Sequence, residues 1–90
     1  MATIRIPTPL RPYAGGQSSV EATGATVGEV LDNLASAHDG LRKHLFDGAE
    51  LRSFVNIYLN EEDVRYLQGA QTAVSPTDTL LIIPSIAGGQ

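Results

Sequence analysis

Residues that could catalyse a reaction or hold a metal are few in this chain, and their spacing suits neither role. His38 and His44 lie six positions apart, whereas paired metal-binding histidines on a helix are typically about four apart. The acidic run at 61–63 lacks the register of a calcium-binding loop. No serine stands in a Gly-x-Ser-x-Gly elbow, and there is no cysteine. The sequence therefore predicts no catalytic residue, no metal site and no bound cofactor, and the chain is not expected to be an enzyme.

The end of the chain, "IIPSIAGGQ", offers a different kind of chemistry. Gly88 and Gly89 have no side chains, so this segment could enter a narrow channel and come close to a bound nucleotide. The only reactive group of a diglycine terminus is its α-carboxylate, which an ATP-dependent enzyme could activate as an acyl-adenylate. Attack by a sulfur donor would then give a thiocarboxylate. In that case the protein is a substrate, and the catalytic groups belong to its partners. The simpler alternative is a frayed terminus or residues left from cloning.

Length and composition narrow the class of protein. Ninety residues make one small domain, and a hydrophobic content of 42% suits a folded chain. Ten acidic against six basic residues give a net charge of −4, which argues against nucleic-acid binding because phosphate contacts need clustered Lys and Arg. The sequence has neither a membrane-length apolar run nor the apolar core of a signal peptide, so a cytoplasmic location away from membranes is expected.

The first half of the chain predicts a hairpin followed by a helix. Residues 3–7 alternate polar and apolar, and residues 18–23 form a weaker second strand, antiparallel to the first. Thr26 and Glu29 have the spacing of a capping box, and apolar residues then recur at helical intervals up to Leu41. Gly40 is expected to end this helix in a left-handed conformation. Residues 41–46 could add one more helical turn.

The second half predicts two main strands and a short one. Residues 53–59 alternate, with one face formed by Val55, Ile57 and Leu59 and the other by Phe54, Asn56 and Tyr58. Residues 60–63 read as a solvated turn and residues 64–67 as a short fourth strand. Residues 75–78 predict a proline-initiated turn in which Asp78 can accept bonds from backbone amides. The apolar run at 79–84 predicts an interior strand, apolar on both faces and parallel to a neighbour.

This order of elements predicts an α+β fold of the β-grasp, ubiquitin-like type. A mixed sheet of four to five strands would carry one main helix across one face, with the first and last strands parallel at its centre. Residues 1–84 would form the domain, and residues 85–90 a flexible tail carrying the diglycine. Phe54 and Tyr58 would lie on the open side of the sheet, either covered by Pro84, Arg5 or a loop, or exposed as a partner-docking patch.

The whole chain resembles the ubiquitin-like sulfur carriers of the ThiS/MoaD family. The residues that carry the resemblance are "FVNIYLNEEDVRYLQG" at 54–69 and "TLLIIPSIAGG" at 79–89. They are similar to the branch of the family that delivers sulfur for cysteine synthesis. The resemblance implies a carrier whose Gly89 carboxyl is adenylated and converted to a thiocarboxylate. It also implies that Ile86, Ala87 and Gly88 enter the channel of the activating enzyme, and that Phe54 and Tyr58 contribute to docking.

The same resemblance implies a set of partners. An activating enzyme would use ATP, and a pyridoxal-phosphate-dependent cysteine synthase would accept the sulfur. A zinc-dependent peptidase would release the product or mature the carrier. The carrier itself would bind no cofactor, nucleic acid or membrane, and would be a monomer that forms transient complexes.

Gln90 departs from the family pattern, because it leaves the Gly89 carboxyl in a peptide bond. Gln90 could be removed by a peptidase, could be an added cloning residue, or could mark a protein that uses the fold only for binding; the first explanation is favoured. Two other functions stay open beside the sulfur carrier. One is a protein modifier that forms isopeptide bonds, and the other is a non-covalent interaction domain with an inert tail.

Overall fold

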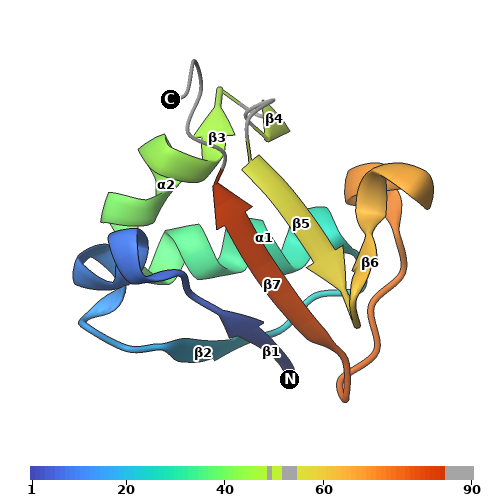
Figure 1. Cartoon of the computed structure of the whole chain (residues 1–90), viewed down its shortest axis with the longest axis horizontal. Coiled ribbons are helices and arrows are strands. Elements are labelled where there is room, and N and C mark those ends of the chain that lie inside the picture. The colour runs from blue at the N-terminus through green and yellow to red at the C-terminus, as the bar shows by residue number, and fades with distance from the viewer. Residues whose placement is uncertain (49, 52–54, 85–90) are drawn as a thin grey trace.

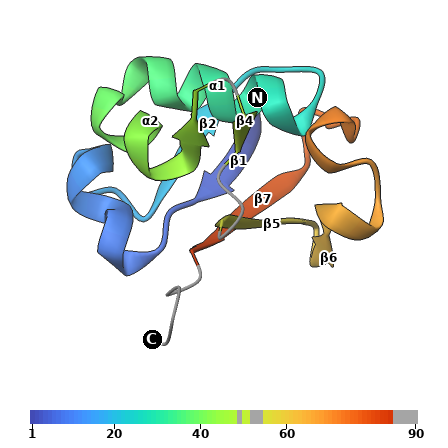
Figure 2. The same ribbon diagram turned by 90° about the horizontal axis from the view of Figure 1, so that it is seen from above.

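The computed structural model describes residues 1–48, 50–51 and 55–84. Five strands form the principal sheet in the order β2-β1-β7-β5-β6, and β3 pairs with β4 in a small separate sheet. The strands are β1 (Ala2–Arg5), β2 (Ser19–Ala22), β3 (Phe46–Asp47), β4 (Glu50–Leu51), β5 (Val55–Leu59), β6 (Glu62–Asp63) and β7 (Thr79–Pro84). The helices α1 (Val27–Ala37) and α2 (Asp39–Leu45) lie on the same side of the principal sheet (Figure 1, Figure 2). The predicted β-grasp fold is confirmed.

The N-terminal strand organises the sheet. It pairs antiparallel with β2 and parallel with β7, as the sequence predicts. The connection between β1 and β2 is more regular than expected, because the 3₁₀ helix η1 (Thr8–Ala14) occupies it. Pro9 lies in the first turn of η1, where a helix needs no backbone N–H donor. Gly15, with a φ of 68°, ends η1 in the left-handed region that glycine adopts readily.

The predicted capping box begins α1. The Thr26 side chain accepts a hydrogen bond from the Glu29 backbone N–H at 3.2 Å, and the Glu29 carboxylate accepts one from the Ala25 N–H at 3.0 Å. In the standard capping box this carboxylate accepts from the N–H of the cap residue, here Thr26, whereas Glu29 accepts from the residue before the cap. Both bonds satisfy backbone donors close to the helix start. They determine where α1 begins.

The predicted role of Gly40 is wrong. The helix α1 ends at Ala37, with His38 as its cap, and Gly40 lies inside α2. A Cβ at Gly40 would come within 3.1 Å of the Tyr13 ring, so glycine allows η1 to pack closely against α2. The extra helical turn expected after it is present. Its buried residues Leu41 and Leu45 are one helical turn apart and face the core.

The predicted strand at 64–67 is also wrong. Val64–Tyr66 forms the 3₁₀ helix η2, and the short fourth strand, β6, comes just before it. Positive φ values of 50° and 78° at Asn60 and Glu61 reverse the chain tightly after β5. The strand β6 therefore pairs with the end of β5 directly after this turn, through Glu62 and Asp63. A second short turn, η3 (Gly69–Gln71), follows and packs against α1. The β3–β4 hairpin was not predicted.

The sheet has one buried and one open face. Toward the helices, Ile4, Ile57, Leu80 and Ile82 are buried together with Leu31 of α1. On the other face of β7, Leu81 is half-buried and Ile83 is 39% exposed. The prediction of an interior strand, apolar on both faces and parallel to a neighbour, is confirmed, but the two faces differ in how far they are buried. In the part of the chain that the structure describes, α1 and α2 pack on one side of the sheet and leave the other side open (Figure 2).

Candidate functional site

The predicted reactive terminus follows directly from the central strand. Pro84, the last residue of β7, pairs with Val55 of β5, and the chain continues from there into the tail. The tail residues expected to react or to enter an enzyme channel lie outside the described residues, as does Phe54. They are Ile86, Ala87, Gly88, Gly89 and Gln90. The described part of the site is therefore the sheet from which the tail extends.

Tyr58 and two residues of β7 form an apolar area on the open face. Tyr58 is half-buried and stands opposite Leu81 in the β5–β7 pairing, and Ile83 is two residues further along β7. Arg5 on β1 is also opposite Leu81, on its other side, and is exposed. We call Arg5, Tyr58, Leu81 and Ile83 the open-face surface. Sequence reasoning identified Tyr58 but missed Leu81 and Ile83, although their alternation with Leu80 and Ile82 was a readable signal.

A hollow of about 510 Å³ lies at the end of this surface furthest from the tail, lined by Arg5, Tyr58, Asn60, Glu61, Thr79 and Leu81. Hydrogen bonds hold its rim in place. The Asn60 side chain donates to the Asp78 carboxylate at 2.9 Å and accepts from the Thr79 backbone N–H at 3.0 Å.

Asp78 performs the turn-forming role predicted for it. Its carboxylate accepts a bond from the Ser75 backbone N–H at 2.7 Å. That bond, followed by the bond from the Asn60 amide, lowers the pKa of Asp78 below its ordinary value. The negative charge of Asp78 therefore helps to hold the start of β7 in position.

Asp63 was predicted to be part of a solvated turn, and this is wrong. The residue is only 8% exposed and contacts Arg65. Its carboxylate accepts bonds from the Arg65 guanidinium, at 3.0 Å from Nη2, and from the Arg65 backbone N–H at 2.9 Å. The side-chain bond to Arg65 is the main reason why the pKa of Asp63 lies below its ordinary value. Glu61 and Glu62 are exposed, as predicted.

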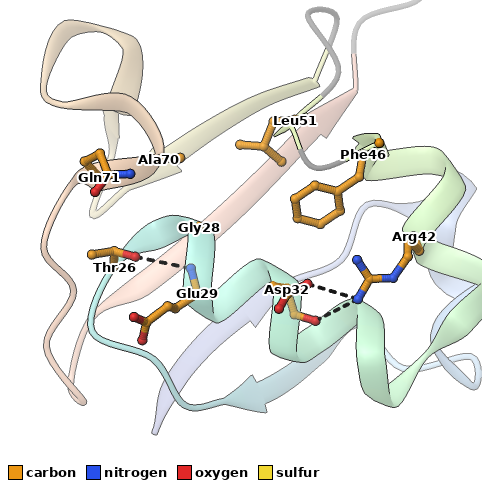
Figure 3. Close-up of a pocket in the computed structure, with 10 residues that line it drawn as sticks. Thr26, Gly28, Glu29, Asp32, Arg42, Phe46, Leu51, Ala70 and Gln71 are labelled. Atoms are coloured by element: carbon orange, nitrogen blue, oxygen red, sulfur yellow. Dashed lines mark hydrogen bonds and ion pairs between the residues drawn. The ribbon is translucent and has the colours of Figure 1, made fainter.

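A larger hollow, of about 800 Å³, lies on the helix side (Figure 3). Phe46 and Leu51 form one wall, and Glu29 and Asp32 of α1 form the other. The Arg42 guanidinium donates to the Asp32 carboxylate at 3.0 Å and to Ser36 Oγ at 3.1 Å, and lies 5.5 Å from the centre of the Phe46 ring. Arg42 therefore ties α2 to α1 and shapes one end of the hollow.

The histidines occupy structural positions. His38 caps α1, and the His44 ring lies 4.3 Å from the Tyr13 ring, centre to centre. Among the residues that the structure describes, no three His, Cys, Asp or Glu side chains gather in a way that could hold a metal. Within that same part of the chain, no helix is both long and apolar enough to cross a membrane.

Comparison with known proteins places the chain in a family. Residues 4–89 match the ThiS family. The chain is 46% identical over 90 residues to the sulfur carrier protein CysO of Mycobacterium tuberculosis, covering 97% of both proteins. It is 38% identical over 65 residues to small archaeal modifier protein 3 of Haloferax volcanii, covering 72% of this chain and 71% of that protein.

The fold has close counterparts among solved structures. A chain in the crystal structure of the BexX/CysO complex of Amycolatopsis orientalis superimposes with a TM-score of 0.90 at 46% identity. The match covers 99% of this chain and 100% of that one. Sequence and structure agree, so the chain belongs to the ThiS family.

Proposed function

We propose that this protein is a sulfur carrier that transports sulfur as a thiocarboxylate on Gly89. The observation that carries the proposal is the family match over residues 4–89, which includes the diglycine at its end. The 46% identity to CysO over nearly the whole of both proteins supports the same role. The protein is accordingly a substrate of other enzymes and not itself an enzyme.

The proposed chemistry takes place in two steps at the Gly89 carboxyl group. The Gly89 carboxylate attacks the α-phosphorus of ATP, forms an acyl-adenylate and releases pyrophosphate. A sulfide nucleophile then attacks the acyl carbon and displaces AMP, which leaves a thiocarboxylate. Because Gly88 and Gly89 have no side chains, the terminus fits a narrow enzyme channel, with Ile86 and Ala87 as the segment that the enzyme grips. ATP is the co-substrate of the activating partner.

Gln90 must be removed before the first step. A peptidase would hydrolyse the Gly89–Gln90 bond with one water molecule and free the Gly89 carboxylate. The family match ends at Gly89, the residue whose carboxyl group is proposed to react. Residues 1–84 would then be the folded domain that partner enzymes bind, and residues 85–90 the tail that is processed.

The open-face surface is the proposed docking site for the activating enzyme. It contains the half-buried Tyr58, and we assign Phe54 to the same surface from its position in the sequence. Leu81 and Ile83 extend the apolar area along β7 toward the tail. An enzyme bound to this face would hold the strand that leads directly to its substrate.

Cysteine is the proposed destination of the sulfur, and the cytoplasm the proposed location. The partners would be an ATP-dependent activating enzyme, a pyridoxal-phosphate-dependent cysteine synthase and a zinc-dependent peptidase. A related CysO chain has been crystallised with BexX, which supports the formation of complexes by this chain too.

Activation assays with two forms of the chain test this function. The form ending at Gly89 should support ATP–pyrophosphate exchange by the activating enzyme of its own genome and, with sulfide, should gain the mass of one oxygen-to-sulfur replacement. The form retaining Gln90 is the matched control and should do neither. Loss of both signals in the Gly89 form would overturn the sulfur-carrier role.

A protein modifier is the second candidate, favoured by the 38% identity to small archaeal modifier protein 3. Modifier and carrier share the activated carboxyl group but differ in the nucleophile that attacks it. High-mass conjugates in native cells that disappear when the chain ends at Gly88 would support the modifier. If the free thiocarboxylate accumulates without conjugates, the carrier is supported. If the protein keeps its function when residues 88–90 are removed, the chain is a binding domain with an inert tail.

A further inference from the structure

Tyr66, which follows the edge strand β6, exposes almost its whole side chain to solvent. Tyr66 in η2 is 86% exposed, and Leu67 directly after it is 39% exposed. Tyr66 is the most exposed of the large hydrophobic residues in the described ranges. An aromatic residue in this position contributes little to burial, so its presence calls for another explanation.

The backbone beneath Tyr66 is firmly held. Val64, two residues earlier, is buried, and the Leu67 N–H donates to the Val64 carbonyl at 2.9 Å. The Asp63 carboxylate accepts from both the backbone and the guanidinium of Arg65. After the turn, the Gln68 N–H donates to Thr72 Oγ1 at 3.0 Å. Because the turn is already ordered, a partner that binds the Tyr66 ring loses little conformational entropy.

This turn adjoins the open-face surface. Asp63 is directly opposite Tyr58 in the β5–β6 pairing, and side chains of such a pair lie on the same face of a sheet. Asp63 holds the Arg65 guanidinium, so Arg65 lies on that side as well. The bond to Asp63 is the main reason why the pKa of Arg65 is raised, and Tyr66 and Tyr58 add smaller contributions, so each tyrosine lies within electrostatic range of Arg65. The turn η2 also packs directly against β5. Figure 1 shows the coil after β6 at the border of the sheet, beside β5.

The charge pattern indicates the chemistry of a partner. Arg65 is neutralised by Asp63, whereas Arg5, across the open face, takes part in neither ion pair found among the described residues. A complementary surface would therefore be apolar opposite Tyr58, Leu81 and Ile83, and would present a carboxylate to Arg5. Tyrosine is one of the residue types enriched at binding hot spots, because its ring supplies a large contact area with few rotatable bonds.

We propose that Tyr66 is a docking anchor whose ring enters an apolar pocket on the activating enzyme, while Arg5 pairs with a carboxylate of that enzyme. This inference rests on the proposed function, and it adds a residue outside the sheet that selects the partner. The activating enzyme is the occupant because the anchor is continuous with the face that carries β7 toward the reactive terminus. A downstream enzyme or a second copy of the chain is the alternative occupant.

The test compares variants of the chain ending at Gly89. Tyr66→Ala should raise the Kd for the activating enzyme, measured by calorimetry, and the carrier KM in pyrophosphate exchange by about tenfold, with kcat nearly unchanged. Tyr66→Phe keeps the ring and should restore both values. Tyr13→Ala is the control, since it removes a 40% exposed tyrosine ring that belongs to η1 and packs against α2, away from the open-face surface. Urea unfolding of each variant separates docking from stability.

Several outcomes would overturn the anchor. One is a Kd for Tyr66→Ala within about twofold of the unsubstituted chain, and another is an equal loss for Tyr13→Ala. A loss confined to the cysteine synthase, or to self-association in sedimentation, would assign Tyr66 to another occupant and overturn the proposal as stated. If the unsubstituted chain binds the activating enzyme but is not adenylated, the proposed function fails while the binding data still decide the role of Tyr66. If it does not bind at all, both fail.

Discussion

The two faces of β7 show how one apolar strand can serve two purposes. Leu80 and Ile82 point toward the helices and are fully buried, whereas Ile83, on the other face, is 39% exposed. Alternate side chains of a strand point to opposite faces, so neighbouring residues of similar chemistry meet different surroundings. The covered face supplies stability, and the open face leaves apolar surface that a partner can bury. Substitutions on the two faces should therefore have separable effects.

The largest expected effect is on the covered face. Ile82→Ala should lower the free energy of unfolding by about 2–5 kcal/mol, because it removes buried methyl groups and leaves a cavity. Ile83→Ala should cost less, about 1–2 kcal/mol, since Ile83 is already 39% exposed to water. Urea unfolding of both variants measures the difference. Equal losses would show that the open face is part of the core.

The next prediction concerns the open face, where a substitution should impair docking more than stability. Ile83→Asp should lower the free energy of unfolding by less than Ile82→Ala does, by at most about 2 kcal/mol, but should raise the carrier KM of the activating enzyme about tenfold, because a charge would be buried at the docked interface. Thr23→Asp adds the same charge at an exposed position just after β2 and is the control. An unchanged KM for Ile83→Asp would remove the open face from the docking site.

A smaller effect concerns the helix that covers the buried face. Thr26→Ala removes the side-chain acceptor of the Glu29 N–H and should cost about 1 kcal/mol of stability. Thr23→Ala, at an exposed threonine outside the helix, should change stability by less than about 0.5 kcal/mol. Thermal unfolding monitored by circular dichroism distinguishes them. A neutral Thr26→Ala would mean that another group caps α1.

The smallest expected effect is on stability at acidic pH, and it involves Asp63 and Asp78 beside the open face. The pKa values of Asp63 and Asp78 are lowered in the folded state, so the unfolded chain takes up protons first as the pH falls. Their stabilising contribution is complete above the ordinary aspartate pKa, about 3.9, and is lost as the pH falls from there toward the folded values. Asp78→Asn should therefore show a shallower loss of stability with acid than the unsubstituted chain. Identical slopes in urea titrations between about pH 5 and pH 2 would contradict this.

Features that depend on short-range contacts were predictable from the sequence. The capping box at Thr26 and Glu29 and the turn held by Asp78 are hydrogen bonds between residues three positions apart. The strands around Ile4 and Ile57 follow from alternation. The β-grasp order and the family followed from the sequence of these elements together with the terminal diglycine.

The misjudged residues are those whose role depends on a distant neighbour. Gly40 resembles a helix end, but it is needed because Tyr13 packs against it. Asp63 resembles a surface acid, yet it is buried where β6 pairs with β5 at the sheet edge, and its ion pair with the exposed Arg65 shapes the turn that presents Tyr66. The sequence could not show that Ile82 is buried while Ile83 is exposed, because both are isoleucines in one apolar run.

Periodicity and capping are encoded within a few residues, so the main strands, the helix α1 and their order could be predicted before any fold was known, and the diglycine is read directly from the sequence. Burial is a property of packing between segments far apart in the chain. The folded arrangement alone therefore established which face of the sheet stays uncovered and which side chains border it.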